Sequence, residues 1–220
     1  GETVALIGAT GCGKSTVINL IPRFYDATEG TVSVDGVNVK DYSQKELRNK
    51  IGYVSQKATL FTGTIESNVA YGDNGQKNAS ETDIKKALDI AQASEFVDSL
   101  EDGSKAYVAQ GGSNFSGGQK QRMSIARAIA RKPEILIFDD SFSALDYKTD
   151  RVLREALAKS CKDSTRIIVA QRIGTIRDAD RIIVLEDGKI AGMGRHEELM
   201  RDCEVYRQIA LSQLSKEELA

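Results

Sequence analysis

The chain has 220 residues, of which 40% are hydrophobic and 28% are charged, and its formal net charge is −2. This length and composition are typical of one globular domain, or of a domain with a subdomain, and the near-neutral charge argues against nucleic acid as a partner. No apolar run approaches the roughly 18–20 residues that span a bilayer, and no signal peptide is visible. Three widely separated cysteines indicate a reducing compartment rather than a disulfide framework. The chain begins with Gly1 rather than Met, so we expect a piece of a longer protein.

A glycine-rich loop begins eight residues into the chain. Residues 3–7 before it are apolar and β-prone and predict a buried strand, and residues 15–21 after it predict the first turns of a helix. The loop fits the phosphate-binding pattern of Gly, four residues, then Gly-Lys-Ser/Thr. Its residues are Gly8, Ala9, Thr10, Gly11, Cys12, Gly13, Lys14, Ser15 and Thr16.

The residue types in this loop suit a nucleotide. Glycine lets the backbone adopt positive φ and approach a ligand closely, so that successive N–H groups form an anion nest. Lys14 adds a positive charge for the β- and γ-phosphates, and the Ser15 hydroxyl can ligate Mg²⁺. The alternative is a glycine-rich turn without a ligand. This alternative is disfavoured because the glycines, Lys14 and Ser15 all fall at the positions of the pattern directly after a strand.

The remaining elements alternate short apolar strands with helices, apart from a helix-dominated stretch over 57–131. This alternation predicts an α/β fold with a mostly parallel sheet covered on both faces, whose ligands bind at the carboxyl ends of the strands. We expect strands at 31–34, 37–39, 51–54, 135–138, 166–170, 181–185 and 189–191. We expect helices capped by Ser43 and Ser80 and helices opening near 64 and 94. We also expect a loop at 74–80, longer helices over 119–131 and 148–160, a short helix near 176, and terminal helices around 197–200 and 205–209.

A second anion site is predicted directly before the long helix, at Ser116, Gly117, Gly118 and Gln119. A serine N-cap followed by two glycines supplies a hydroxyl, free backbone N–H groups and the positive end of a helix. Two phosphate sites in one chain make sense if one serves a nucleotide that another chain holds. A plain N-cap is the alternative. The arginines of this helix predict a solvated face; they are Arg122, Arg127 and Arg131.

With these motifs the chain resembles the nucleotide-binding domain of an ATP-binding cassette (ABC) transporter over essentially its whole length. The segments at 60–68 and 194–199 resemble the exporter type. The resemblance implies a P-loop NTPase fold in one domain, 1–220, truncated at its N-terminus, with a RecA-like core at 1–56 and 132–220 and a helical subdomain at 57–131. The matching motifs are Walker A at 8–16, the Q-loop Gln56, the signature at 115–119 with Phe115 in place of Leu, Walker B at 135–139 and the D-loop at 143–146.

The resemblance also implies ATP and Mg²⁺ as ligands and a set of partners. In this family two domains meet head to tail, so Ser116 to Gln119 would contact the partner's ATP. Asp139 would hold magnesium through water, with Ser15 and Gln56 as further ligands, while Gln56 would also reach the attacking water and the membrane domain. The implied activity is ATP hydrolysis that drives substrate efflux from the cytoplasmic face of a membrane, together with a second nucleotide-binding domain and transmembrane domains and without nucleic acid.

Two departures from the family pattern fall on catalytic positions. Asp140 stands where the family has the Glu that polarises the attacking water, and its carboxylate is set back by roughly 1 Å, a displacement that can lower a rate about 10²-fold. Gln171 stands where the family has the switch histidine, and an amide cannot become cationic. The only histidine, His196, is predicted to be a surface residue. By the resemblance, Asp140 and Gln171 would carry catalysis together with Lys14 and Gln56.

These departures predict the degenerate-site half of a heterodimeric multidrug exporter, whose own site hydrolyses slowly and whose partner domain is non-identical. The alternatives are a fully active homodimeric exporter ATPase and a soluble ABC ATPase acting on nucleic acid or ribosomes. Long coiled coils, a second cassette and basic linkers are absent, which disfavours the soluble type. The aromatic that stacks on adenine in exporters would precede Gly1, so we expect weak ATP binding and weak hydrolysis by this chain alone.

Overall fold

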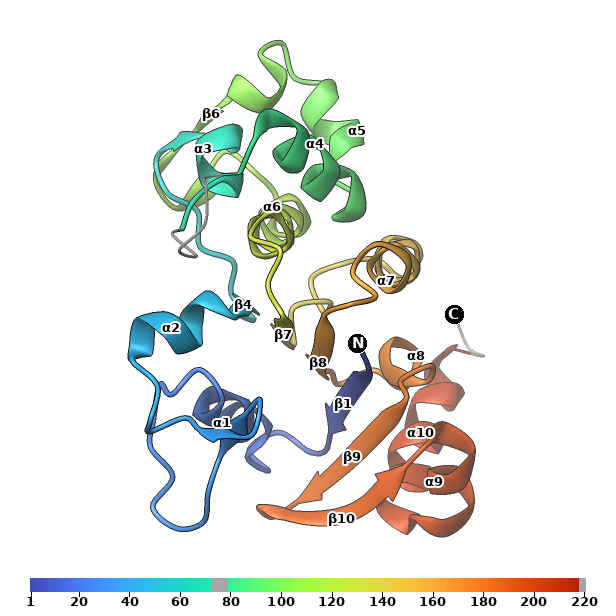
Figure 1. The fold of residues 1–220 in the computed structure, drawn as a ribbon. Helices are drawn as coiled ribbons and strands as arrows, with labels where there is room; N and C mark the ends of the chain where they lie inside the picture. Colours follow the sequence, from blue (N-terminus) through green and yellow to red (C-terminus); the bar gives the residue numbers. More distant parts are fainter. Residues whose placement is uncertain (73–78, 218–220) are drawn as a thin grey trace.

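In the computed structural model, which describes residues 1–72 and 79–217, one six-stranded sheet has the order β10-β9-β1-β8-β7-β4. Figure 1 shows this sheet running diagonally through the molecule from β4 to β10. Its strands are β1 (Thr3–Ile7), β4 (Ile51–Val54), β7 (Ile135–Asp139), β8 (Thr165–Val169), β9 (Arg181–Glu186) and β10 (Lys189–Gly194). Two short antiparallel pairs are separate from it: β2 (Ser33–Val34) with β3 (Val37–Asn38), and β5 (Gly63–Thr64) with β6 (Tyr107–Val108).

The large sheet is parallel except at one edge. Strand β1 pairs in parallel with β8 and β9, and β7 pairs in parallel with β8 and β4. Strand β10 joins β9 antiparallel through a turn in which Asp187 has φ 46° and Gly188 has φ 75°, the positive angles that tight hairpin turns need. The prediction of a mostly parallel sheet is confirmed. Because β1, β4, β7 and β8 run in the same direction, the segments that follow them meet at the carboxyl ends of these strands.

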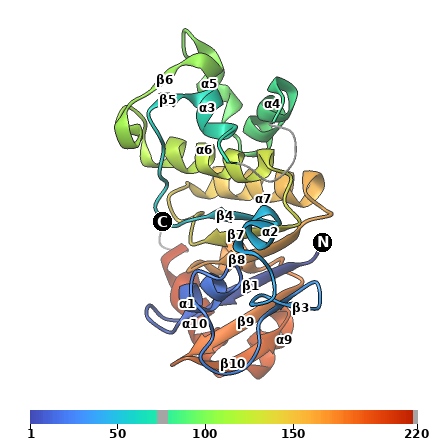
Figure 2. The same ribbon diagram turned by 60° about the vertical axis from the view of Figure 1, so that its left-hand side comes forward.

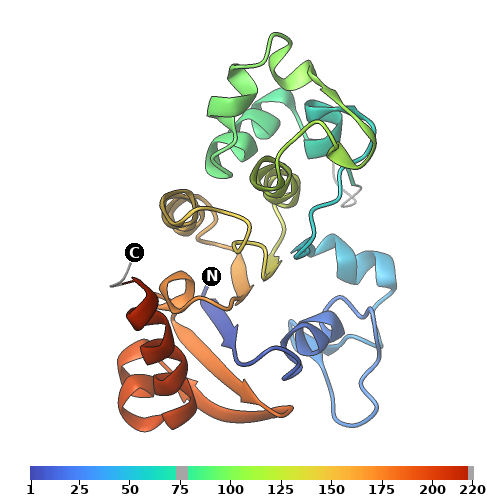
Figure 3. The same ribbon diagram turned by 180° about the vertical axis from the view of Figure 1, so that it is seen from behind.

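Helices cover both faces of the sheet (Figures 1 and 3). Helices α1 (Lys14–Leu20) and α2 (Gln44–Asn49) lie against one face. The other face is covered by α6 (Gly117–Ala130), α7 (Tyr147–Ser160), α8 (Ile173–Ile176), α9 (His196–Asp202) and α10 (Glu204–Glu217). Because successive side chains of a strand point to opposite faces, Ile137 joins the apolar cluster around Ile18 of α1, while Leu136 and Phe138 join the cluster on the other face.

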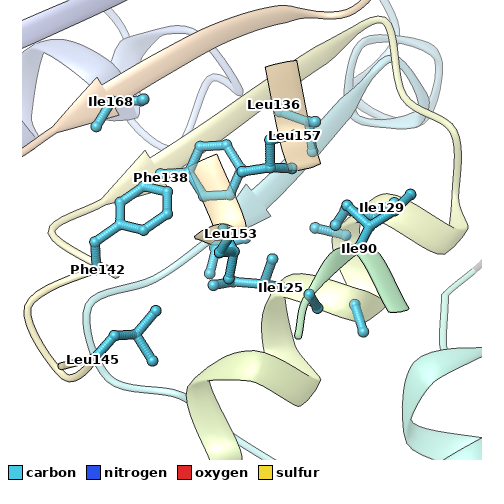
Figure 4. Packing of buried hydrophobic residues seen from close by; sticks show 14 of the residues in the cluster. Ile90, Ile125, Ile129, Leu136, Phe138, Phe142, Leu145, Leu153, Leu157 and Ile168 are labelled. Atoms are coloured by element: carbon cyan, nitrogen blue, oxygen red, sulfur yellow. The ribbon is translucent and has the colours of Figure 1, made fainter. Parts of the chain in front are cut away.

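The larger of these two clusters holds the long helices against the sheet. Figure 4 shows Phe138 of β7 and Ile168 of β8 together with Ile125 of α6 and Leu153 of α7, and all four side chains are at most 5% exposed. Figure 2 shows α6 and α7 stacked over the sheet. Complete burial of a side chain of this size contributes about 1.5–3 kcal/mol, so this contact fixes both long helices relative to β7.

A helix-rich layer packs on the far side of α6. It contains α3 (Ile65–Val69), α4 (Glu81–Ile90) and α5 (Ser94–Asp98), with one-turn helices η1 (Gly103–Lys105) and η2 (Gln110–Gly112), at the top of Figure 1. The arginines at 122, 127 and 131, in α6 and at its C-cap, were predicted to form a solvated face. This prediction is wrong because each guanidinium donates to a backbone carbonyl of another segment. Arg127 donates to Asn68 O and Thr59 O, both at 2.8 Å, and Arg122 and Arg131 donate to Gln92 O and Arg48 O.

The secondary structure agrees closely with the sequence-based predictions. The serine caps are confirmed at Ser43, Ser80 and Ser116, each of which accepts a hydrogen bond from the third residue of its helix. The long helix begins at Gly117 rather than at residue 119, and the pair β5 and β6 was not predicted. The predicted loop at 74–80 lies mostly outside the described residues. None of the helices within 1–72 and 79–217 has the length and hydrophobicity needed to cross a membrane.

Candidate functional site

The glycine-rich loop between β1 and α1 has the backbone geometry that its sequence predicts. Gly11 has φ 84° and Gly13, the N-cap of α1, has φ 100°, so both lie in the left-handed region that favours glycine. The start of the loop is packed tightly, because a Cβ on Gly8 would overlap the carbonyl oxygen of Leu185. Lys14 Nζ donates to the Gly8 and Ala9 carbonyl oxygens, each at 2.8 Å, and these bonds hold the ammonium group inside the loop.

The loop opens into a cavity of about 230 Å³ that brings together most of the predicted site residues. Gly8, Ala9 and Cys12 lie instead along an adjoining cavity of about 630 Å³ between the loop and α10, where Cys12 is 6% exposed. The residues that line the first cavity are Thr10, Gly11, Gly13, Lys14, Ser15, Thr16, Gln56, Asp140, Val169 and Gln171.

Asp139 does not line this cavity itself but is hydrogen-bonded to Ser15, which does. Ser15 donates its hydroxyl to Asp139 Oδ1 at 2.8 Å, and the Tyr53 hydroxyl lies 3.0 Å from Asp139 Oδ2 and 2.9 Å from Asn19 Oδ1. Burial raises the pKa of Tyr53, and the negative charge of Asp139 raises it further, so the phenol stays protonated and can donate. Tyr53 was not predicted as a site residue. The pairing of β4 with β7 would have indicated it. Tyr53 pairs with Ile137, which lies two residues before Asp139 and on the same face of β7.

Asp140 lies at the centre of a pair of amide contacts. Its Oδ2 accepts hydrogen bonds from Gln56 Nε2 at 2.9 Å and from Gln171 Nε2 at 2.7 Å, so the structure joins three of the predicted catalytic side chains. Asp140 is 6% exposed and has φ 47°, and its N–H donates to Val169 O at 3.0 Å. Burial raises the pKa of the Asp140 carboxyl; the hydrogen bond from Gln171 opposes this rise, and the charge of Asp139 adds to it.

The oxygen donors at Ser15, Asp139 and Gln56 fit a magnesium ion that phosphate oxygens also hold. Mg²⁺ prefers hard oxygen ligands and is usually bound through one or two carboxylates together with substrate phosphates. Within the described part of the chain, no group of three or more His, Cys, Asp or Glu is placed to hold a metal by itself. The donors at Ser15, Asp139 and Gln56 therefore fit a Mg²⁺ ion whose other ligands are phosphate oxygens or water.

The serine cap at the second predicted anion site is present, and it lies apart from this cavity. Ser116 caps α6, since its Oγ accepts from Gln119 N at 3.2 Å and Gln119 Oε1 accepts from Ser116 N at 2.9 Å. A Cβ on Gly117 would meet no atom within 4 Å, so the backbone there is open to a ligand, whereas Gly118 lies against Ala144 O. None of Ser116 to Gln119 lines the cavity of the glycine-rich loop. The two predicted anion sites therefore lie in separate places within the described part of the chain.

The segment after β8 connects this site with the loop that follows β7. Arg172 donates from Nη1 to Leu145 O and from Nη2 to Ser143 O, both at 3.2 Å, and its guanidinium carbon lies 4.8 Å from the centre of the Tyr147 ring. Asp146 caps α7 by accepting from Thr149 N at 2.9 Å. Sequence reasoning did not predict this role of Arg172, and no local pattern indicates it because its partners lie more than 20 residues away.

His196, which was predicted to be a surface residue, is only partly exposed. Its side chain is half-buried, and Nδ1 lies 2.8 Å from the hydroxyl of Tyr206, which is itself fully buried. Burial raises the pKa of that hydroxyl to about 12. His196 does not line the cavity of Asp140 and Gln171, so the residues that the structure brings to this cavity include no imidazole.

Known proteins resemble this chain in sequence and in fold. The family model for ABC transporters matches residues 1–143. An uncharacterized ABC transporter ATP-binding protein of Mycobacterium tuberculosis is 47% identical over 213 residues, which make up 97% of this chain and 36% of that protein. ABC transporter B family member 21 of Arabidopsis thaliana is 47% identical over 210 residues, 95% of this chain and 16% of that protein.

A solved structure of a bacterial Atm1-family ABC exporter with ATP bound matches the fold with a TM-score of 0.92 and 37% sequence identity. The match covers 97% of this chain and 37% of that chain. The chain thus spans little more than a third of the mycobacterial relative and of the exporter, and a smaller share of the plant protein.

Proposed function

This chain belongs to the ABC transporter family, as an ATP-binding domain of a class that hydrolyses ATP, and from this premise we propose that it is the motor domain of an exporter. Binding and hydrolysis of ATP at its glycine-rich loop would drive efflux of a substrate across a membrane. One observation carries the proposal most directly: Lys14, Ser15, Gln56, Asp140 and Gln171 line the same cavity.

Each of these side chains has a role that its contacts support. The backbone of the loop and Lys14 bind the phosphates, and Ser15 and Asp139, already joined by a hydrogen bond, take the metal together with Gln56. When bound, magnesium supplies positive charge that neutralises the phosphate oxygens during transfer. Phosphoryl transfer needs positioning and charge neutralisation more than covalent chemistry, so correct placement of a few side chains is sufficient.

Asp140, Gln56 and Gln171 act on the attacking water. The Asp140 carboxylate can accept a proton or a hydrogen bond from that water, and the two amides that donate to Oδ2 orient the carboxylate. Gln171 would turn its amide toward the γ-phosphate once nucleotide fills the cavity. An amide cannot carry the positive charge that an imidazolium would bring, so the transition state receives less stabilisation at this position.

The signature segment serves a second nucleotide-binding domain. The open backbone at Gly117 and the capping hydroxyl of Ser116 suit a phosphate, and neither residue lines the cavity of this chain's own loop. A head-to-tail dimer would place this segment over the partner's ATP. The further partners are transmembrane domains of the same exporter, which place this domain at the cytoplasmic face of the membrane. Within the chain we assign 1–56 and 132–220 to the core and 57–131 to the helical subdomain.

The contact between Asp140 and Gln171 supports a site that hydrolyses slowly. Both departures from the family pattern lie in one hydrogen-bonded pair, whereas the glycine-rich loop and Ser116 to Gln119 keep their motifs. Such asymmetry suits one half of a heterodimeric multidrug exporter, in which the partner domain is non-identical and this chain completes the partner's more active site.

Two measurements test the proposal. In the assembled transporter, Lys14→Ala should abolish nucleotide binding at this site, and unchanged binding would remove the assignment of the loop. In the unaltered transporter, a photoreactive ATP analogue retained at this site after incubation with Mg²⁺ should be recovered mainly as the triphosphate. Recovery mainly as the diphosphate would support a fully active homodimeric exporter instead.

A further inference from the structure

We infer that Gln213 of the C-terminal helix α10 is a positioning residue that holds Gln171 in place for hydrolysis; this inference rests on the role of Gln171 proposed above. The Gln213 side chain bridges the segment on both sides of Arg172. Its Nε2 donates to Gln171 O at 2.6 Å, and its Oε1 accepts from Ile173 N at 2.8 Å. A single amide thus fixes the backbone on which the Gln171 side chain stands.

The bridge satisfies one backbone group on each side of Arg172, the carbonyl of Gln171 and the N–H of Ile173. Ile173 is the first residue of α8, and the first N–H groups of a helix have no acceptor within the helix. Arg172, the N-cap of α8, supplies no side-chain cap hydrogen bond. Gln213 supplies this missing acceptor from another helix, although it lies 40 residues away along the chain. The start of α8 therefore depends on the position of α10.

Three neighbouring residues are consequently tied to three different parts of the fold. The Gln171 side chain donates to Asp140, the Arg172 side chain donates to Leu145 O and Ser143 O, and Ile173 N donates to Gln213. A backbone held at both ends keeps the base of the Gln171 side chain in one position, from which its amide can still turn. If the bridge is lost, the segment can shift, and a shift of about 1 Å at a catalytic group can lower a rate by up to about 10²-fold.

The experiment measures turnover of Mg²⁺-ATP by this site in the assembled transporter, with the partner domain's own phosphate-binding loop inactivated. Gln213→Leu removes both hydrogen bonds, and we expect kcat to fall about tenfold while KM stays within about twofold, because positioning acts on the transition state more than on ground-state binding. Gln213→Glu keeps the acceptor for Ile173 N but loses the donor to Gln171 O, and should give an intermediate kcat.

Gln208→Leu is the matched control, because Gln208 lies on the same helix, is exposed, and bonds to Glu204 of that helix. It should leave kcat and the thermal unfolding temperature unchanged. A fall in kcat for Gln208→Leu as large as for Gln213→Leu would mean a general effect of α10 and would overturn the inference. The Gln213→Glu variant keeps the comparison open if the leucine variant folds poorly.

The decisive comparison adds Gln213→Leu to a Gln171→Ala background. If Gln213 acts through Gln171, the second substitution should change kcat by less than about twofold in that background, since the residues of one network are not additive. A further tenfold loss would overturn the inference. If Gln171→Ala lowers kcat and Gln213→Leu does not, the bridge alone is refuted. If Gln171→Ala leaves kcat unchanged, the proposed role of Gln171 fails, and the inference fails with it.

Discussion

Asp140 and Gln171 differ from the family pattern, and replacing them with the family's residue types should accelerate hydrolysis at this site. The perturbation is the double substitution Asp140→Glu with Gln171→His. One oxygen of the Asp140 carboxylate already has two partners, because Oδ2 lies 2.9 Å from Gln56 Nε2 and 2.7 Å from Gln171 Nε2. A longer glutamate must therefore displace both amides, and the exchange at position 171 has to accompany it.

The structure bounds the expected size of the effect. The extra methylene carries the carboxylate about 1 Å further toward the cavity, and a change of this size at a reacting group is worth up to about 10²-fold in rate, or about 2.7 kcal/mol of activation free energy. The backbone opposes the change. Position 140 has φ 47°, and this left-handed region is tolerated better by aspartate than by most other side chains. We expect the glutamate to lower the free energy of unfolding by about 1 kcal/mol.

The assay is single-turnover conversion of bound ATP to ADP at this site in the assembled transporter, for the unaltered protein, both single variants and the double variant. We expect the double variant to be about tenfold to 100-fold faster, and Asp140→Glu alone to gain less than that. Because the two side chains are in contact, the single effects should not add to the double effect. A double variant within about twofold of the unaltered protein would refute the idea that these two residues limit hydrolysis.

Three further outcomes follow from contacts in and near the site. Asp140→Asn should raise the unfolding temperature at pH 7. Burial raises the pKa of the Asp140 carboxyl in the fold above its ordinary value of 3.8, so the unaltered protein loses stability as pH rises from 3.8 to the raised pKa. Calorimetry should therefore show that the difference in unfolding temperature between variant and unaltered protein vanishes below about pH 4. Tyr53→Phe should raise the Mg²⁺ concentration for half-maximal hydrolysis about tenfold by releasing Asp139, and an unchanged magnesium titration would exclude this role. Arg127→Lys should lower the free energy of unfolding in urea by about 2–3 kcal/mol, because lysine cannot replace three separate hydrogen bonds to Asn68 and Thr59; a loss below about 0.5 kcal/mol would contradict this.

The parts of the site that could be predicted depend on short spacings. The glycine-rich loop is determined by residues within nine positions, and Asp139 and Asp140 follow from their place at the end of a buried apolar strand. The helix caps at Ser43, Ser80 and Ser116 could be predicted for the same reason, since each serine and the N–H that donates to it are three residues apart. Local geometry alone determines these features.

The contacts that escaped prediction join residues far apart in the chain. Arg127 bonds to Asn68 and Thr59, 59 and 68 residues away, and Gln213 bonds to Gln171 from 42 residues away. A single arginine or glutamine on a helix has the same sequence pattern whether it faces solvent or another segment. Tyr53 is an intermediate case, since the strand register would have placed it beside Asp139 had the pairing of β4 with β7 been known.

The apolar cluster shown in Figure 4 has a consequence for how the molecule opens. It continues without a break from Ile168 and Phe138 in the sheet through Ile125 of α6 to Ile90 of α4. The helix-rich layer therefore has no separate core that could remain folded when the sheet melts. Amide hydrogens in the middle of α4, α6 and β7 should exchange with solvent through one cooperative opening and with similar protection. A ligand that tightens the glycine-rich loop would then slow exchange in a layer that it never touches.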